Sequence, residues 1–129
     1  MTRGEYWNEE IETMPADARR RLENERLSEQ ITYNHRTSAF YREKLNSAGV
    51  KPADIRDVVD LARIPFMEKR DLAASQEDGT LLGINRCADL TEIVRIQATG
   101  GTTGQPLRIG WTRRDIADYT RWPIARSGP

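Results

Sequence analysis

A glycine- and threonine-rich segment at residues 99–106 constrains the fold of this chain more than any other feature. An apolar, strand-like run precedes it at residues 92–98, and a second such run follows at residues 107–111. Glycine reaches backbone conformations that other residues avoid, so the segment predicts a tight loop that joins two strands. An isolated two-stranded hairpin is only marginally stable in water, and these strands therefore require cover from helices or from further strands.

Helical composition dominates the rest of the chain. Pro15 suits a first helical turn, and the residues that follow it are rich in alanine, arginine, glutamate and leucine. Capping residues predict further helices that begin at Ser38, Asp57, Glu68 and Thr112, with Gly49 ending the first of these. The expected helical ranges are 15–36, 38–48, 57–64, 68–75 and 112–119.

This order of elements predicts an α/β fold class, in which an N-terminal helical layer leads into the first strands of a larger sheet. We expect residues 1–129 to form a single partial domain. Within it, residues 1–75 would form a helical segment, and residues 92–119 a strand–loop–strand–helix unit.

The charge balance excludes partners that are recognised through a strong overall field. Twenty basic and twenty acidic residues cancel, so neither nucleic acid nor an anionic membrane is an expected partner. Cys87 is the only cysteine, which excludes an internal disulfide and a multi-cysteine metal site. The sequence shows neither a membrane-spanning apolar run nor a signal-like start, and we expect a cytoplasmic protein.

The composition of the loop at residues 99–106 suits a polyphosphate. Successive backbone N–H groups form anion-binding nests, and threonine hydroxyls add further donors. The loop is not a Walker A motif, because Gly104 is followed by Gln105 and Pro106 rather than by lysine and a helix. It is not a dinucleotide fingerprint either, and a hairpin turn without a ligand is the alternative interpretation.

The same segment resembles the phosphate-binding signature of the adenylate-forming (AMP-binding) enzymes. Other blocks are similar to one branch of them, the phenylacetate–CoA ligase family, and the resemblance runs in order to about Tyr119. The blocks that carry it are Tyr6-Trp7-Asn8, Phe40–Leu45, Ala48-Gly49-Val50, Asp60–Phe66, Lys69–Leu72, Thr99–Pro106 and Ile109–Thr112.

The resemblance implies an ATP-dependent activation of an aryl or acyl carboxylate, followed by transfer of the acyl group to coenzyme A. ATP, Mg²⁺ and coenzyme A are the cofactors that it implies, and a small-molecule carboxylate is the substrate. It places the ATP phosphates against Thr99, Gly100, Gly101, Thr102, Thr103, Gly104 and Gln105. The family loop usually carries lysine where this chain has Gln105, which removes one positive charge from the site.

Family members are several times longer than these 129 residues, and residues 122–129 do not resemble the family's continuation. No catalytic residue or metal ligand is identifiable in the chain, so we expect an N-terminal fragment without turnover of its own. Two alternatives remain open. One is a phosphate- or nucleotide-binding module, and the other is a subunit that completes a ligase with a complementary chain or as a homo-oligomer.

Isolated reactive or charged side chains are expected to have structural roles. His35 has no identifiable acidic or nucleophilic partner along the sequence, and we expect it to be a surface or packing residue. The basic runs at residues 19–21 and 113–114 are expected to be solvated, although the second lies near the loop. Seven aromatic residues are expected to pack rather than to stack on bases: Tyr6, Trp7, Phe40, Tyr41, Trp111, Tyr119 and Trp122.

Overall fold

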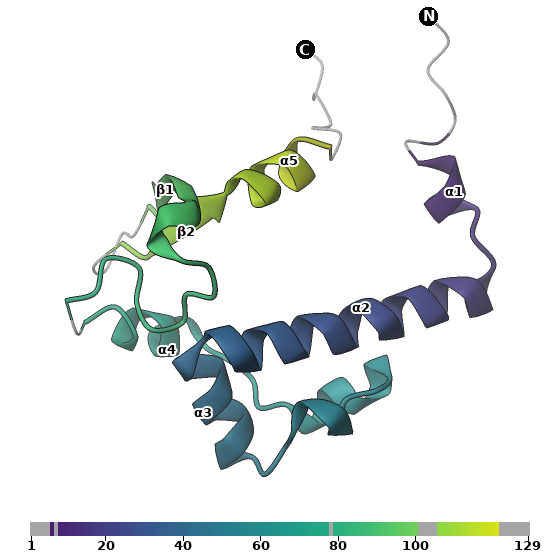
Figure 1. Cartoon of the computed structure of the whole chain (residues 1–129), viewed down its shortest axis with the longest axis horizontal. Helices are drawn as coiled ribbons and strands as arrows, with labels where there is room; N and C mark the ends of the chain where they lie inside the picture. Colours follow the sequence, from purple (N-terminus) through teal and green to yellow (C-terminus); the bar gives the residue numbers. More distant parts are fainter. Residues whose placement is uncertain (1–5, 7, 78, 101–105, 122–129) are drawn as a thin grey trace, which may run out of the picture.

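The computed structural model describes residues 6, 8–77, 79–100 and 106–121. This part of the chain is mostly helical and contains one small antiparallel sheet, as the predicted fold class requires. Figure 1 shows the long helix α2 and its neighbour α3 on one side, with the sheet and α5 on the other. The elements are α1 (Glu9–Glu12), α2 (Ala16–Thr37), α3 (Ala39–Ser47), η1 (Pro52–Asp54), η2 (Val58–Arg63), α4 (Lys69–Ala74), η3 (Leu90–Glu92), β1 (Ile93–Ala98), β2 (Arg108–Thr112) and α5 (Arg113–Arg121), where η marks a 3₁₀ helix.

The N-terminal helices enclose a small apolar core. Leu45 on α3 packs with Val50 and Ile55, and Ile55 has no exposed surface. Partly buried residues of α2 and the segment after η2 surround this cluster: Leu27, Ile31 and Ile64. Gly49 has a φ of +65° after the C-cap of α3, which explains why the helix ends at the predicted glycine.

Two predicted caps differ in how their side chains are used. Asp57 caps η2 as predicted, because its carboxylate accepts a hydrogen bond from the Val59 amide at 3.0 Å. Ser38 occupies the N-cap position of α3, but its hydroxyl donates to the Ile84 carbonyl at 2.9 Å instead of capping the helix. Ser38 is almost completely buried, so this bond ties the helical layer to the segment that leads into the sheet.

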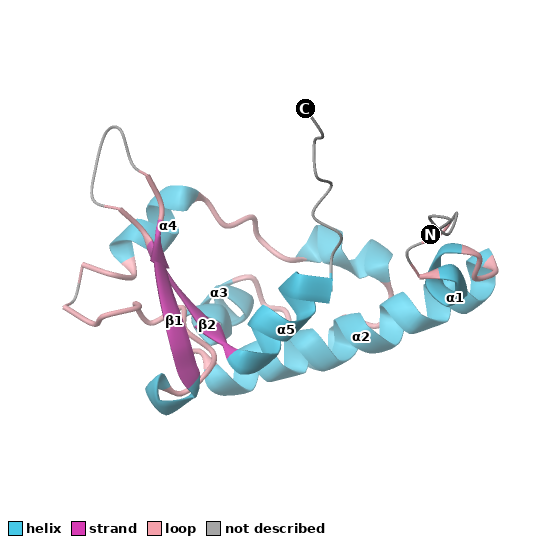
Figure 2. Cartoon of the chain, turned by 90° about the horizontal axis from the view of Figure 1, so that it is seen from above, coloured by secondary structure: helices cyan, strands magenta, loops and turns pink. Residues whose placement is uncertain are grey.

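The sheet consists of β1 and β2, which run antiparallel on either side of the glycine- and threonine-rich loop. Gln97 lies opposite Ile109 and Ala98 opposite Arg108, with an irregularity near Ile93. A Cβ at Gly110 would lie 2.7 Å from Leu82 Cδ1, so glycine allows the segment before β1 to pack directly against β2. Figure 2 shows α4 beside the loop end of the two strands.

Helix α5 begins directly after β2 with the capping box that the sequence predicts. The Thr112 amide donates to Asp115 Oδ2 at 2.8 Å, and the Asp115 amide donates to Thr112 Oγ1 at 3.2 Å. Both predicted strands and the last predicted helix are therefore present. Within the described ranges, every helix is too short or too polar to cross a lipid bilayer.

Candidate functional site

The ends of the glycine- and threonine-rich loop are joined by two hydrogen bonds. The Thr99 amide donates to the Leu107 carbonyl at 2.9 Å, and the Leu107 amide donates to Thr99 Oγ1 at 3.1 Å. Leu107 is 8 % exposed, so its amide lies where water has little access. We call Thr99, Leu107 and Arg108 the loop neck. The neck fixes where the loop leaves β1 and where it enters β2.

The predicted phosphate contacts divide into two groups. Thr99 and Gly100 are described, with Thr99 half-buried in the neck and Gly100 exposed just beyond it. Thr99 Oγ1 already accepts a hydrogen bond, but a hydroxyl also donates, which leaves its O–H able to reach an anion. The other five predicted contacts lie outside the described residues: Gly101, Thr102, Thr103, Gly104 and Gln105.

Gln76, which follows α4, is a neck contact that the sequence does not reveal. Its Nε2 donates to the Arg108 carbonyl at 2.8 Å, and the Arg108 amide donates to its Oε1 at 3.0 Å. The two residues are 32 positions apart, and no motif or periodicity links them. The first residue of β2 is therefore held by a side chain from the helical layer.

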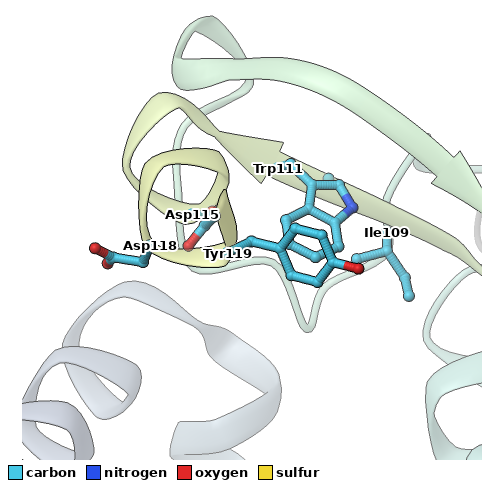
Figure 3. A pocket seen from close by; sticks show the side chains of 6 residues that line it. Ile109, Trp111, Asp115, Asp118 and Tyr119 are labelled. Atoms are coloured by element: carbon cyan, nitrogen blue, oxygen red, sulfur yellow. The ribbon is translucent and has the colours of Figure 1, made fainter. Parts of the chain in front are cut away.

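An open pocket of about 610 Å³ lies between β2 and α5. Figure 3 shows the Tyr119 ring against the Trp111 indole, and the ring centroids are 5.5 Å apart in an edge-on arrangement. The residues that line the pocket are Ile109, Gly110, Trp111, Asp115, Asp118 and Tyr119. Trp111 and Tyr119 pack against each other, as predicted for the aromatic residues, and they also form the apolar wall of this pocket.

The polar groups around this pocket leave one donor unsatisfied. Trp111 Nε1 is buried, and no acceptor among the described residues lies within hydrogen-bonding distance of it. Asp115 is engaged in the cap of α5, and Asp118 lies 3.8 Å from Arg114 on the same helix. In Figure 3 the Asp118 side chain points away from the two rings. A buried indole N–H normally has a partner, so Trp111 Nε1 is an exception among the described residues.

The other candidates from the sequence have no assembled site in the part of the chain that the structure describes. His35 is half-buried on α2, and Arg113 and Arg114 are exposed at the start of α5. Burial raises the pKa of the half-buried Cys87 thiol, which makes it less reactive. No group of three or more histidine, cysteine, aspartate or glutamate side chains converges among the described residues to hold a metal ion.

Comparison with known proteins places this chain beside one group of enzymes. It is 38 % identical over 118 residues to a phenylacetate–coenzyme A ligase of Thermus thermophilus, and 33 % identical over 117 residues to one of Escherichia coli. These matches cover 92 % and 91 % of this chain. The chain spans about a quarter of the length of either relative, 25 % in both cases. No protein-family model matches the sequence.

The fold is similar to that of a solved acyl-CoA ligase. A crystal structure of 2-hydroxyisobutyryl-CoA ligase, in complex with 2-HIB-AMP and CoA in the thioesterification state, superposes with a TM-score of 0.79 and 32 % identity. The match covers 89 % of this chain and 25 % of that one. An open conformation of the same ligase matches with a TM-score of 0.72 and 31 % identity, over 79 % of this chain and 22 % of that one.

Proposed function

We propose that this chain, which is homologous to the N-terminal part of the phenylacetate–coenzyme A ligases, supplies the nucleotide-phosphate loop of an ATP-dependent acid–CoA ligase. In the proposed reaction a carboxylate oxygen attacks the α-phosphorus of ATP, and pyrophosphate leaves as the acyl-adenylate forms. The thiol of coenzyme A then attacks the acyl carbon, so that the thioester forms and AMP is released. The main observation that supports a phosphate-binding role for the loop is the loop neck, whose hydrogen bonds are all formed within this chain.

The proposed contribution of the loop is electrostatic. Negative charge develops on the pyrophosphate as it leaves, and donors that are already oriented stabilise that charge without reorganising. The Thr99 hydroxyl and the Gly100 amide are the described donors proposed for this role, and the five remaining donors would continue along the loop. Gln105 would contribute a neutral hydrogen bond where the family usually has a charged lysine, and neutral bonds are roughly half as strong.

The described residues gather no carboxylate cluster for Mg²⁺. We propose that Mg²⁺ bound to the nucleotide would supply part of the positive charge that a lysine at position 105 would otherwise provide. No described residue is assigned as a ligand of the ion. The proposal includes a cytoplasmic location, where ATP and coenzyme A are both available.

The rest of the ligase fold is the proposed partner of the apolar surface beside the loop. Ile109 is 46 % exposed and Tyr119 is 58 % exposed, and both lie next to the unsatisfied Trp111 indole N–H. We call Ile109, Trp111 and Tyr119 the Trp111 surface. The matched relatives continue for about three times the length of the matched region, because the match covers 25 % of them. That additional polypeptide would supply apolar cover for the exposed Ile109 and Tyr119 side chains.

Fragment complementation tests this proposal. The purified chain is mixed with the part of the Thermus thermophilus relative that lies beyond the homologous region, and AMP production is measured with phenylacetate and coenzyme A. The chain alone is expected to give no AMP, whereas the mixture gives AMP that depends on both substrates. Ile109→Asp should abolish complementation, and Val59→Asp should preserve it, since Val59 is 67 % exposed on η2, away from the Trp111 surface.

Three results would contradict the proposal. The first is AMP production by the chain alone, and the second is a mixture without any activity although both parts are folded by circular dichroism. The third is equal complementation by the two aspartate variants, which would remove the Trp111 surface from the interface.

A binding module that acts without the rest of a ligase is the second candidate. The closed neck favours it, because the loop ends are held by hydrogen bonds within this chain. Nucleotide binding by the chain, together with failure of complementation by the folded parts, would support the module over the ligase part.

A further inference from the structure

We propose that Gln76 is a positioning residue for the phosphate loop, because its side-chain amide takes the place of a neighbouring strand at the first residue of β2. This inference rests on the proposed function for its effect on nucleotide binding. We call the two hydrogen bonds between the Gln76 side chain and the Arg108 main chain the Gln76 clamp, and these contacts do not depend on the proposed function.

The hydrogen-bond pattern of the sheet shows why Arg108 needs such a partner. The Thr99 amide donates to the Leu107 carbonyl across the hairpin, while the Leu107 amide donates to the Thr99 hydroxyl, so these two residues occupy a bonded position. Antiparallel pairs alternate between bonded and non-bonded positions. The next pair, Ala98 and Arg108, is therefore a non-bonded pair, in which the amide and carbonyl of Arg108 point away from β1. An edge of this kind is left open unless another group covers it.

Gln76 covers this edge with matching chemistry. A primary amide has the same N–H donor and C=O acceptor as a peptide group. Its Nε2 donates to the Arg108 carbonyl at 2.8 Å while its Oε1 accepts from the Arg108 amide at 3.0 Å. The main chain at the loop exit is thus held by β1 on one side, at Leu107, and by Gln76 on the other side.

The support of Gln76 is itself fixed. Ser75, the preceding residue, is 6 % exposed, and its hydroxyl donates to the Leu72 carbonyl at 2.7 Å. The Ser75 carbonyl accepts from the Ile84 amide at 3.1 Å, which joins the end of α4 to the segment that leads into the sheet. Gln76 therefore connects the end of α4 to Arg108 and fixes the position of the neck relative to that helix. Because preorganised donors are worth more than donors that must be ordered on binding, this connection should strengthen phosphate binding.

The test compares Gln76→Met with Gln30→Met in the full chain. Methionine keeps the length and flexibility of glutamine but makes no amide hydrogen bond, so packing changes little. Gln30 is the matched control, because its Nε2 donates only within α2, to Asn34 at 2.7 Å. Two quantities are measured by NMR: hydrogen exchange of the Arg108 amide without ligand, and the dissociation constant of MgATP for the folded fraction.

Gln76→Met is expected to raise the exchange rate of the Arg108 amide by about fivefold, the factor that the loss of its one neutral hydrogen bond gives. The MgATP dissociation constant should rise by about fivefold or more, because both hydrogen bonds to the Arg108 main chain are lost. Gln30→Met should leave both unchanged. A purely structural role for Gln76 would lower the folded fraction but leave the dissociation constant of the folded molecules as it was.

Unchanged Arg108 exchange in Gln76→Met would overturn the clamp whether or not nucleotide binds. Faster exchange with an unchanged MgATP dissociation constant would overturn the positioning role and leave the proposed function intact. Absence of MgATP binding by the unsubstituted chain would contradict the loop assignment under the proposed function, and the positioning role would fall with it.

Discussion

Replacing Thr99 with valine removes a single acceptor from the loop neck while keeping the shape of the side chain. Thr99 Oγ1 is the atom that accepts the Leu107 amide, at 3.1 Å. Valine places a methyl group there, so the Leu107 N–H loses its partner. Leu107 is 8 % exposed, and water therefore has little room to replace the lost oxygen.

The expected loss of free energy of unfolding follows from that burial. Leaving a buried donor without an acceptor costs about 1–3 kcal/mol, and the slight exposure of Leu107 places Thr99→Val near 1–2 kcal/mol. With a urea dependence of about 1–3 kcal/mol per molar for a small protein, the unfolding midpoint should fall by roughly 0.3–2 M. Thr99→Ser keeps the hydroxyl oxygen and loses only a half-buried methyl group, so its midpoint should fall by less.

Urea unfolding followed by circular dichroism measures both midpoints, and hydrogen exchange reports on the Leu107 amide directly. The reasoning predicts the order of stability as unsubstituted chain, then serine, then valine, with faster Leu107 exchange only in the valine variant. A valine variant as stable as the unsubstituted chain, with Leu107 exchange unchanged, would refute the hydrogen bond as the closure of the neck.

Three further predictions concern the scaffold. Ile55→Ala should lower the free energy of unfolding by about 2–5 kcal/mol in urea titrations, because Ile55 has no exposed surface, and a loss below about 1 kcal/mol would contradict its place in the core. Gly83→Ala should reduce the thermal unfolding temperature, because φ is +77° and a Cβ would lie 2.7 Å from the Ser75 carbonyl oxygen; an unchanged temperature would contradict this geometry. A hydrogen bond from Arg20 lowers the pKa of Asp57 to about 2, so its stabilising effect is present above the pKa of the unfolded carboxyl and is lost as the pH falls toward 2. The difference in urea midpoint between the unsubstituted chain and Asp57→Asn should accordingly shrink between about pH 4 and pH 2, and a constant difference would contradict the ion pair.

The sequence predicted elements whose signals lie within a few residues of one another. The glycine at position 49, the aspartate cap at position 57 and the box formed by Thr112 and Asp115 all act over at most four residues. Local spacing was therefore enough to place α3, η2 and α5 within a residue or two. The short helices α1, η1 and η3 were not predicted, although Asn8 caps α1 by accepting from the Ile11 amide.

Contacts between distant segments could not be predicted in the same way. Ser38 looked like a simple helix cap, but its hydroxyl is used by Ile84, 46 residues away. Gln76 carried no signal at all, because a glutamine after a helix is unremarkable until the fold brings Arg108 beside it. The polar partner of such a residue depends on packing of the whole chain, which local propensity does not encode.

In the candidate site too, local features were predictable from the sequence, whereas contacts between distant segments were not. Composition was sufficient to single out the loop as suited to a polyphosphate, and the family resemblance implied the individual contacts at Thr99 and Gly100, which stay predictions. The second role of Thr99, as the acceptor that closes the neck, depends on the register between β1 and β2. The pocket beside Trp111 likewise depends on how α5 folds back against β2, so the aromatic residues alone did not predict it.

The position of bound nucleotide on the chain decides whether the glycine- and threonine-rich loop is the phosphate site. MgATP is titrated into the isotopically labelled chain, and the backbone amide shifts are followed along the described residues. We expect the largest saturable shifts at Thr99, Gly100 and Leu107, with small shifts at Asp118 and Tyr119 in the pocket. Largest shifts at Asp118 and Tyr119, or no saturable shift at the neck, would contradict the assignment of the phosphate site to the loop.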